Sequence, residues 1–313
     1  MNKMNSNLGS DLFIGIDWSG ARKGKLPGVS IAVADAFGSP PKIVNPPRGG
    51  WNRRRVVAWL IFCSRKKKLL VGFDFGFSHP FIDCNSYYPN SALSFLKKPV
   101  ELWQFIDDSS KEFGDFYGGG IWNHSLASIY YNAPNSRRGK KFQSRLRVTE
   151  YEASKEKYPS STFNCVGPAS VGTGTLAGMR VLNYFQNRHS SLVRIWPFAG
   201  PAKNYCSPMT VVEVFPSLYF YRSVGQLFNK KDQNLRTTLN TALASFRSEP
   251  YPDNEPITGP DLDDADALVS AAALRFFATR EIYFDAPFQN PYSTRAAMLE
   301  GWIFGVRNSG KFS

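Results

Sequence analysis

The chain has 313 residues, and its 38 Lys and Arg against 25 Asp and Glu give a formal net charge of +13. Hydrophobic residues make up 42% and aromatic residues 15%, which is ample for a packed core and excludes an intrinsically disordered chain. No apolar run reaches the ~18 residues that a membrane-spanning helix needs, and the scattered cysteines exclude a disulfide framework. We therefore expect a soluble, cytoplasmic protein without a signal peptide or membrane contact, whose partner is a polyanion.

Predicted strands and helices alternate through the first quarter of the chain, which we assign to the first part of a core, residues 11–77. Apolar runs with the alternation of strands surround one stretch with helical periodicity. The predicted elements are strands over 12–16, 28–34 and 41–45, a helix over 51–65 and a buried strand over 69–73.

The regular pattern stops after the fourth strand. Residues 78–165 are rich in Gly, Asn, Ser, Tyr and Pro, and only 93–113 suggests a helix, so we interpret the segment as an insertion. The core resumes over 166–285 and leaves a C-terminal extension, 286–313. Its predicted elements are helices over 171–188, 217–227, 233–246 and 263–278, and strands over 192–196 and 210–215. The order of elements indicates an α/β fold in which the later strands pair in parallel.

Charge is concentrated along the chain. Residues 22–68 hold twelve Lys and Arg against one acid, whereas residues 249–266 hold seven acids and no base. This pattern suggests an anion-binding surface around a cation-binding site, although a run such as 65–68 could be a solvated helix end. Aromatic residues among the basic blocks, including Tyr117 and Trp122, could stack on unpaired bases or serve as core anchors. The residues predicted to hold nucleic-acid phosphates are Arg53, Arg54, Arg55, Arg137, Arg138, Lys140 and Lys141.

Five acids occupy unusual positions. Asp17 ends the first predicted strand and Asp74 follows the fourth, Glu213 lies inside an apolar strand, and Asp263 and Asp266 share one face at the start of a helix. Carboxylates are rare in strands and are seldom buried unless they are paired or bind a metal. Converging carboxylates suit Mg²⁺ or Mn²⁺, and two such ions can activate water in phosphodiester cleavage.

Each acid also has a structural interpretation. Asp17 and Asp74 could be turn residues, and Glu213 could face solvent at a sheet edge. Asp261 or Asp263 could cap the helix that follows. The glycine-rich segment 167–178 lacks the Lys of a P-loop, and we interpret it as a close-packed approach to a helix, with a phosphate contact at its N-terminus as the lesser alternative.

The acids occur in an order that resembles the ribonuclease H-like superfamily, and Asp263-Asp-Ala-Asp266-Ala-Leu resembles the Asp-x-x-Asp-Ala signature of RuvC-type resolvases. The chain is also similar to an uncharacterised family of predicted RNase H-like nucleases. The residues that carry this similarity are Gly15-Ile-Asp17, Phe73-Asp74, Glu213-Val-Phe-Pro216, Asp263-x-x-Asp266-Ala-Leu, Val171-Gly-Thr-Gly-Thr-Leu-Ala-Gly178 and Trp196-Pro-Phe198. The resemblance covers residues 11–76 and 166–278, and Phe215 departs from it where His or Tyr is expected.

The resemblance implies a mixed five-stranded sheet flanked by helices, with the insertion after the fourth strand, and metal-dependent nuclease chemistry. Asp17, Asp74 and Asp266 would hold Mg²⁺ or Mn²⁺, Asp263 would complete the catalytic set, and Glu213 would lie behind these ligands or replace one of them. Two alternatives stay open: a non-catalytic nucleic-acid-binding protein of the same fold, and an actin- or sugar-kinase-like phosphotransferase.

Overall fold

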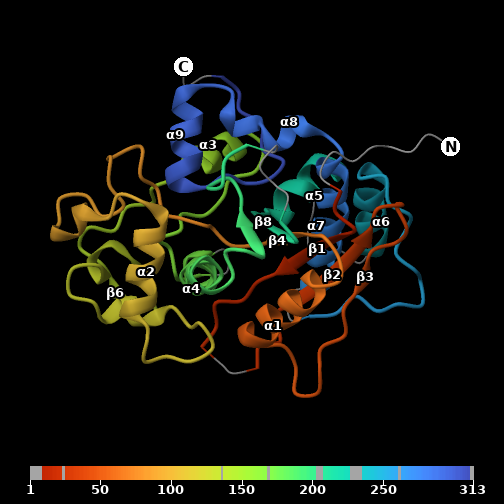
Figure 1. Ribbon diagram of the computed structural model, residues 1–313, viewed down its shortest axis with the longest axis horizontal. Helices are drawn as coiled ribbons and strands as arrows, with labels where there is room; N and C mark the ends of the chain where they lie inside the picture. Colours follow the sequence, from red (N-terminus) through yellow and green to blue (C-terminus); the bar gives the residue numbers. More distant parts are fainter. Residues whose placement is uncertain are drawn as a thin grey trace.

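Among the residues that the structure describes, the sheet contains six strands rather than the expected five. The computed structural model describes residues 9–22, 25–134, 137–167, 170–201, 207–225, 235–259 and 262–310. Within them the strand order is β3-β2-β1-β4-β8-β7 (Figure 1). The five-stranded sheet implied by the resemblance is wrong, because β7, in the segment predicted as a strand over 192–196, pairs with β8 as a sixth strand. The strands are β1 (Leu12–Asp17), β2 (Ser30–Asp35), β3 (Lys42–Ile43), β4 (Leu69–Phe73), β7 (Val193–Ile195) and β8 (Met209–Glu213).

Strand direction brings three chain segments to one edge of the sheet. β1, β4, β8 and β7 run parallel, whereas β2 is antiparallel to both β1 and β3. The register pairs Ile16 with Phe73 and Phe73 with Glu213, so the carboxyl ends of β1, β4 and β8 are level. The residues at or just after these ends are therefore neighbours, as the sequence order predicts.

Helices cover both faces of the sheet, which confirms the α/β class. Phe13 of β1 joins a core formed with α5, α6 and α7, whereas Ile14 points to the opposite core, formed with α1, α2 and α4 (Figure 1). This division follows from the alternation of side chains along a strand. The helices are α1 (Arg53–Ser64), α2 (Pro99–Ser109), α3 (Val148–Ser154), α4 (Gly172–Arg188), α5 (Pro216–Val224), α6 (Leu235–Ser245), α7 (Asp263–Ala278), α8 (Glu281–Phe284) and α9 (Pro291–Glu300).

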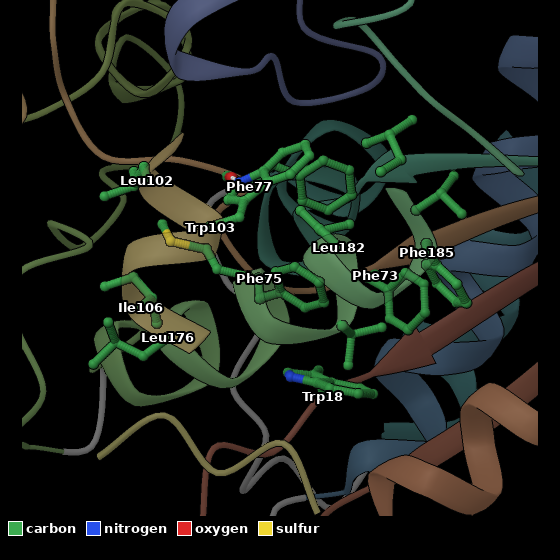
Figure 2. Packing of buried hydrophobic residues seen from close by; sticks show 14 of the residues in the cluster. Trp18, Phe73, Phe75, Phe77, Leu102, Trp103, Ile106, Leu176, Leu182 and Phe185 are labelled. Carbon is green, nitrogen blue, oxygen red and sulfur yellow. Dashed lines mark hydrogen bonds between the residues drawn. The ribbon is translucent and has the colours of Figure 1, made fainter. Parts of the chain in front are cut away.

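The residues of the insertion pack against the core. Figure 2 shows Leu102 and Ile106 of α2 beside Leu176 of α4 in one hydrophobic cluster. The indole Nε1 of Trp103 donates to the carbonyl of Phe77 at 2.8 Å. Besides α2 and α3, the segment forms short 3-10 turns and a small hairpin of β5 (Asn132–Ala133) and β6 (Arg137–Arg138). The absence of one long periodic pattern thus reflects short elements that share the core's interior.

The C-terminal extension also completes the core. Trp302 and Phe304 are fully buried in the cluster that contains α5 and α7. The backbone N–H of Phe304 donates to the carbonyl of Glu213 at 2.8 Å, and Ile303 forms a parallel bridge to the same residue. Residues after α9 therefore continue the hydrogen bonding at the end of β8.

Close packing between α7 and β1 leaves no space for a side chain at Gly15. A Cβ atom there would lie 2.3 Å from the carbonyl oxygen of Ala267 and 2.6 Å from the amide nitrogen of Ala271. Both atoms belong to helix backbone, which cannot move away without shifting α7. The glycine in Gly15-Ile-Asp17 thus allows the helix to lie directly on the strand.

We predict that Gly15→Ala lowers the free energy of unfolding by about 3 kcal/mol, because overpacking against backbone forces the helix away from the sheet. Gly114→Ala is the matched control, since nothing lies within 4 Å of its added Cβ, and it should change stability by less than about 0.5 kcal/mol. Urea denaturation followed by circular dichroism measures both. Equal midpoints for the two variants would contradict the close packing.

Candidate active site

Four of the five predicted acids line one cavity at the carboxyl edge of the sheet. The cavity has a volume of about 950 Å³. Asp17 is the last residue of β1, and Asp74 follows β4 directly, with its N–H donating to the carbonyl of Ile16 at 3.1 Å. Asp263 and Asp266 come from the first turn of α7. Three separate elements thus bring these side chains to a single hollow.

Burial and the neighbouring acids raise the pKa of Asp17. Burial is the largest cause, followed by the charges of Asp266 and Asp74. A hydrogen bond with Asp263 and the charge of Asp263 raise the pKa further. The pKa of Asp17 therefore lies well above its ordinary value of 3.8. Such a shift, produced by burial and by like charges in a cavity, is typical of functional sites.

The chemistry of this cluster suits a hard cation. Oδ2 of Asp263 is buried and has no hydrogen-bond partner among the described residues. Carboxylate oxygens are the ligands that Mg²⁺ and Mn²⁺ prefer. Within the described ranges, however, no three His, Cys, Asp or Glu side chains are grouped as a metal-binding set.

Capping does not explain Asp263. α7 begins after Leu262, whose backbone is left-handed and whose side chain makes no capping bond, and Asp263 is the first helical residue. Asp264 instead points away, as its place on the helix predicts, and accepts hydrogen bonds from the Ser30 hydroxyl (2.6 Å) and from the amide and hydroxyl of Thr258 (2.7 and 2.6 Å). Asp261, the other capping candidate, lies outside the described residues.

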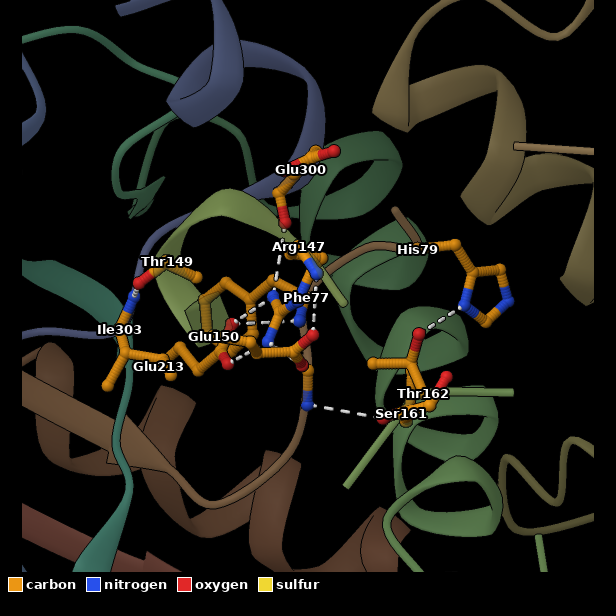
Figure 3. A network of polar contacts seen from close by, with 12 residues as sticks. Phe77, His79, Arg147, Thr149, Glu150, Ser161, Thr162, Glu213, Glu300 and Ile303 are labelled. Carbon is orange, nitrogen blue, oxygen red and sulfur yellow. Dashed lines mark hydrogen bonds and ion pairs between the residues drawn. The ribbon is translucent and has the colours of Figure 1, made fainter. Parts of the chain in front are cut away.

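Glu213 is not an alternative metal ligand. Its Oε2 accepts a hydrogen bond from Nη1 of Arg147 at 2.7 Å and another from the amide of Phe77 at 3.0 Å, and Oε1 forms an ion pair with the same arginine (Figure 3). Arg147 also pairs with Glu150, and all three side chains are buried. The prediction that Glu213 could replace a metal ligand is corrected, because its buried carboxylate is already neutralised by Arg147 and is not free to bind a cation.

Arg53 is not a phosphate ligand either. It is fully buried, and its guanidinium donates to the carbonyls of Ser19, Ala21 and Asp115 at 2.6–3.0 Å. The Asp115 carboxylate in turn accepts the amides of Arg53 and Arg54 at the start of α1 (3.3 and 2.9 Å). Arg53 therefore fixes the loop that follows Asp17, and the sequence prediction fails because a basic run does not reveal which member turns inward.

The other predicted phosphate ligands lie on the surface, outside the cavity. Nη1 of Arg55 donates to backbone carbonyls, Arg138 lies over the ring of Phe142, and Lys141 donates to the carbonyl of Asn90 at 2.7 Å. All six remaining side chains are exposed, and none of them lines the cavity. These residues are Arg54, Arg55, Arg137, Arg138, Lys140 and Lys141.

Cations of the cavity come from residues that the sequence reasoning did not select as ligands. Arg22 belongs to the loop after β1, and Lys157 follows α3 in the insertion. Arg22 follows Asp17 by only five residues, and this closeness to a predicted metal ligand could have identified it as a residue of the site. Nothing in the sequence near Lys157 distinguishes it from other exposed lysines. The cavity is further lined by Trp18, Ser19, Tyr117, Trp122, Tyr158, Ser170, Thr173 and Gly174.

Comparison of the chain with protein-family models, with curated proteins and with solved structures finds no match.

Among the described residues, no helix is both long enough and apolar enough to cross a bilayer.

We predict that Asp17→Asn stabilises the metal-free protein at pH 7 by about 0.5–2 kcal/mol, the usual gain when a strained functional site is relieved. A raised carboxyl pKa in the folded state means that stability is full below the unfolded pKa near 4 and is lost as pH rises. The advantage of the variant should therefore grow above pH 4. Thermal unfolding in EDTA across pH 4–8 measures it, with Asp264→Asn as a control that should lose stability because Asp264 accepts three hydrogen bonds.

We predict the opposite result for Glu213→Gln, which should destabilise the protein by about 3–5 kcal/mol because it leaves Arg147 buried with part of its countercharge removed. Glu249→Gln, at an exposed position, should change stability by less than about 0.5 kcal/mol. The measurement is chemical denaturation in EDTA. Stabilisation by Glu213→Gln would instead place this residue in the repelling acidic cluster.

Proposed function

We propose that the protein is a metal-dependent nuclease that hydrolyses phosphodiester bonds of nucleic acid. The observation that carries the proposal is the meeting of Asp17, Asp74, Asp263 and Asp266 in one cavity at the carboxyl edge of a mixed sheet. An acid on the first strand, one after the fourth and two at the start of the last core helix is the arrangement that the ribonuclease H-like resemblance implies. The order of the central strands is compatible with that fold.

Asp17, Asp74 and Asp266 would hold Mg²⁺ or Mn²⁺. The cation would activate water and stabilise the leaving oxygen. Asp263 lies against Asp17, and its unpartnered Oδ2 would complete the ligand set or accept a proton from that water. Because ligands must be deprotonated and burial raises the pKa of Asp17, protons would compete with the cation, and activity should increase with pH.

The remaining charges support a polyanionic substrate. Arg22 and Lys157 would neutralise phosphates inside the cavity, and exposed basic residues such as Arg54 and Arg137 would hold phosphates farther along the strand. A cytoplasmic location accords with the free thiols of Cys63, Cys84 and Cys165. A non-catalytic nucleic-acid-binding protein of the same fold is the second candidate.

The test uses labelled single-stranded, duplex and branched DNA and RNA, incubated with Mg²⁺, Mn²⁺ or EDTA. We expect metal-dependent cleavage, and Asp17→Asn and Asp266→Asn should each lower the rate by about 10²–10⁴, equivalent to the loss of several kcal/mol of metal-assisted stabilisation. Asp253→Asn is the matched control because it removes an exposed acid from the same acidic segment, and it should cleave at the wild-type rate.

Two results would refute parts of this proposal. Binding without cleavage of any substrate would favour the non-catalytic candidate. Cleavage at the wild-type rate by Asp17→Asn would place the reaction elsewhere in the chain.

A further inference from the structure

Two parts of the chain line the cavity with different chemistry. The core supplies the acids, and the insertion supplies aromatic rings and a cation. We call these residues the insertion wall: Tyr117, Trp122, Pro134, Lys157, Tyr158, Pro159 and Ser160. The wall combines aromatic rings with a cation, so it offers surfaces for a flat ring and for a phosphate beside the acidic cluster.

Unpaired cations near the acids indicate an anionic ligand. The guanidinium carbon of Arg22 lies 5.2 Å from the centre of the Phe113 ring and 5.9 Å from that of Tyr117. Neither Arg22 nor Lys157 forms an ion pair with an acid of the described residues. In a cavity that also holds four carboxylates, cations left unpaired in this way are suited to the phosphates of a substrate.

The start of α4 adds neutral hydrogen-bond donors. Thr173 and Gly174 of its first turn line the cavity, and its N-cap residue, Val171, makes no side-chain capping bond. Trp18 lies next to this turn, because its Cδ1 would be 3.7 Å from a Cβ at Gly174. Its Nε1, the blue atom of Trp18 in Figure 2, is buried without a hydrogen-bond partner among the described residues. Both features favour an anion in this cavity.

The aromatic rings distinguish among nucleic acids. Tyr158 is 69% exposed and lines the cavity, so its ring is accessible to a ligand. A protein ring can stack on a base only when that base is unpaired, because the faces of bases in a duplex are covered by their neighbours. The volume of about 950 Å³ lies at the upper end of the range for clefts that bind small ligands.

We propose that this cavity binds single-stranded nucleic acid, with an unpaired base stacked on Tyr158 and with the adjoining phosphates between Lys157, Arg22 and the acidic cluster. The inference rests on the proposed nuclease function, of which it specifies the substrate. Duplexes contact the same protein through their backbones only and bind more weakly.

The experiment measures binding without catalysis. Fluorescence anisotropy in EDTA compares a labelled single-stranded oligonucleotide with a duplex of the same sequence, using the full chain. We expect at least about 10-fold tighter binding of the single strand. Tyr158→Ala should weaken single-strand binding about 5- to 100-fold, the range for one lost base stack, and should leave duplex binding unchanged. Lys157→Ala should reduce the slope of log affinity against log salt by about 1.

Tyr151→Ala is the matched control, since Tyr151 is a 51% exposed aromatic of the insertion that does not line the cavity; it should bind like the wild type. Tyr158→Phe should retain binding because it keeps the ring. Equal affinity for the two nucleic acids, or equal effects of Tyr158→Ala and Tyr151→Ala, would overturn the inference. Selective binding of single strands with no cleavage in Mg²⁺ or Mn²⁺ would support it and refute the nuclease.

Discussion

Direct contact between α7 and the central strand β1 is the constraint on which the site depends. Gly15 lets the helix backbone approach the strand, and Gly72 on the neighbouring strand faces Leu274 of the same helix. With the axis of α7 fixed, its first turn lies beside the end of β1, so Asp263 and Asp266 reach Asp17. The acids repel one another, but the hydrophobic packing of α7 against the sheet keeps their side chains close together.

Buried arginines join the core to the segments around it. Arg147 of the insertion neutralises Glu213 of β8 and Glu150, and it also donates to the carbonyl of Glu300 at the end of α9 (Figure 3). Arg53 plays a similar part beside the acidic cavity. These arginines are buried together with acids: among the described residues, seven Asp and Glu side chains are buried against five Arg side chains. Internal charge therefore does not lower the net charge of +13 that the protein can present to a polyanion.

The sequence predicts those parts of the structure that depend on short-range patterns. The helix over 263–278 is confirmed as α7, which begins with the predicted acidic turn. The acids at strand ends meet because parallel strands share an edge. The role of Glu213 could not be predicted, since its partner Arg147 lies 66 positions away in an irregular segment. The insertion wall could not be predicted either. Lys157 and Tyr158 belong to no periodic pattern of apolar residues, and only tertiary packing brings them to the cavity.

Asp115 has a consequence for how the cavity can move. This residue of the insertion accepts the first amides of α1, and the arginine that begins α1 holds the loop after Asp17. Swinging this part of the insertion outward would therefore break two hydrogen bonds at the start of a core helix and loosen the loop beside the acids. The segment around Asp115 is therefore held to the core in the free protein. On the function proposed above, a nucleic-acid strand would enter a cavity whose lining is already in place on this side.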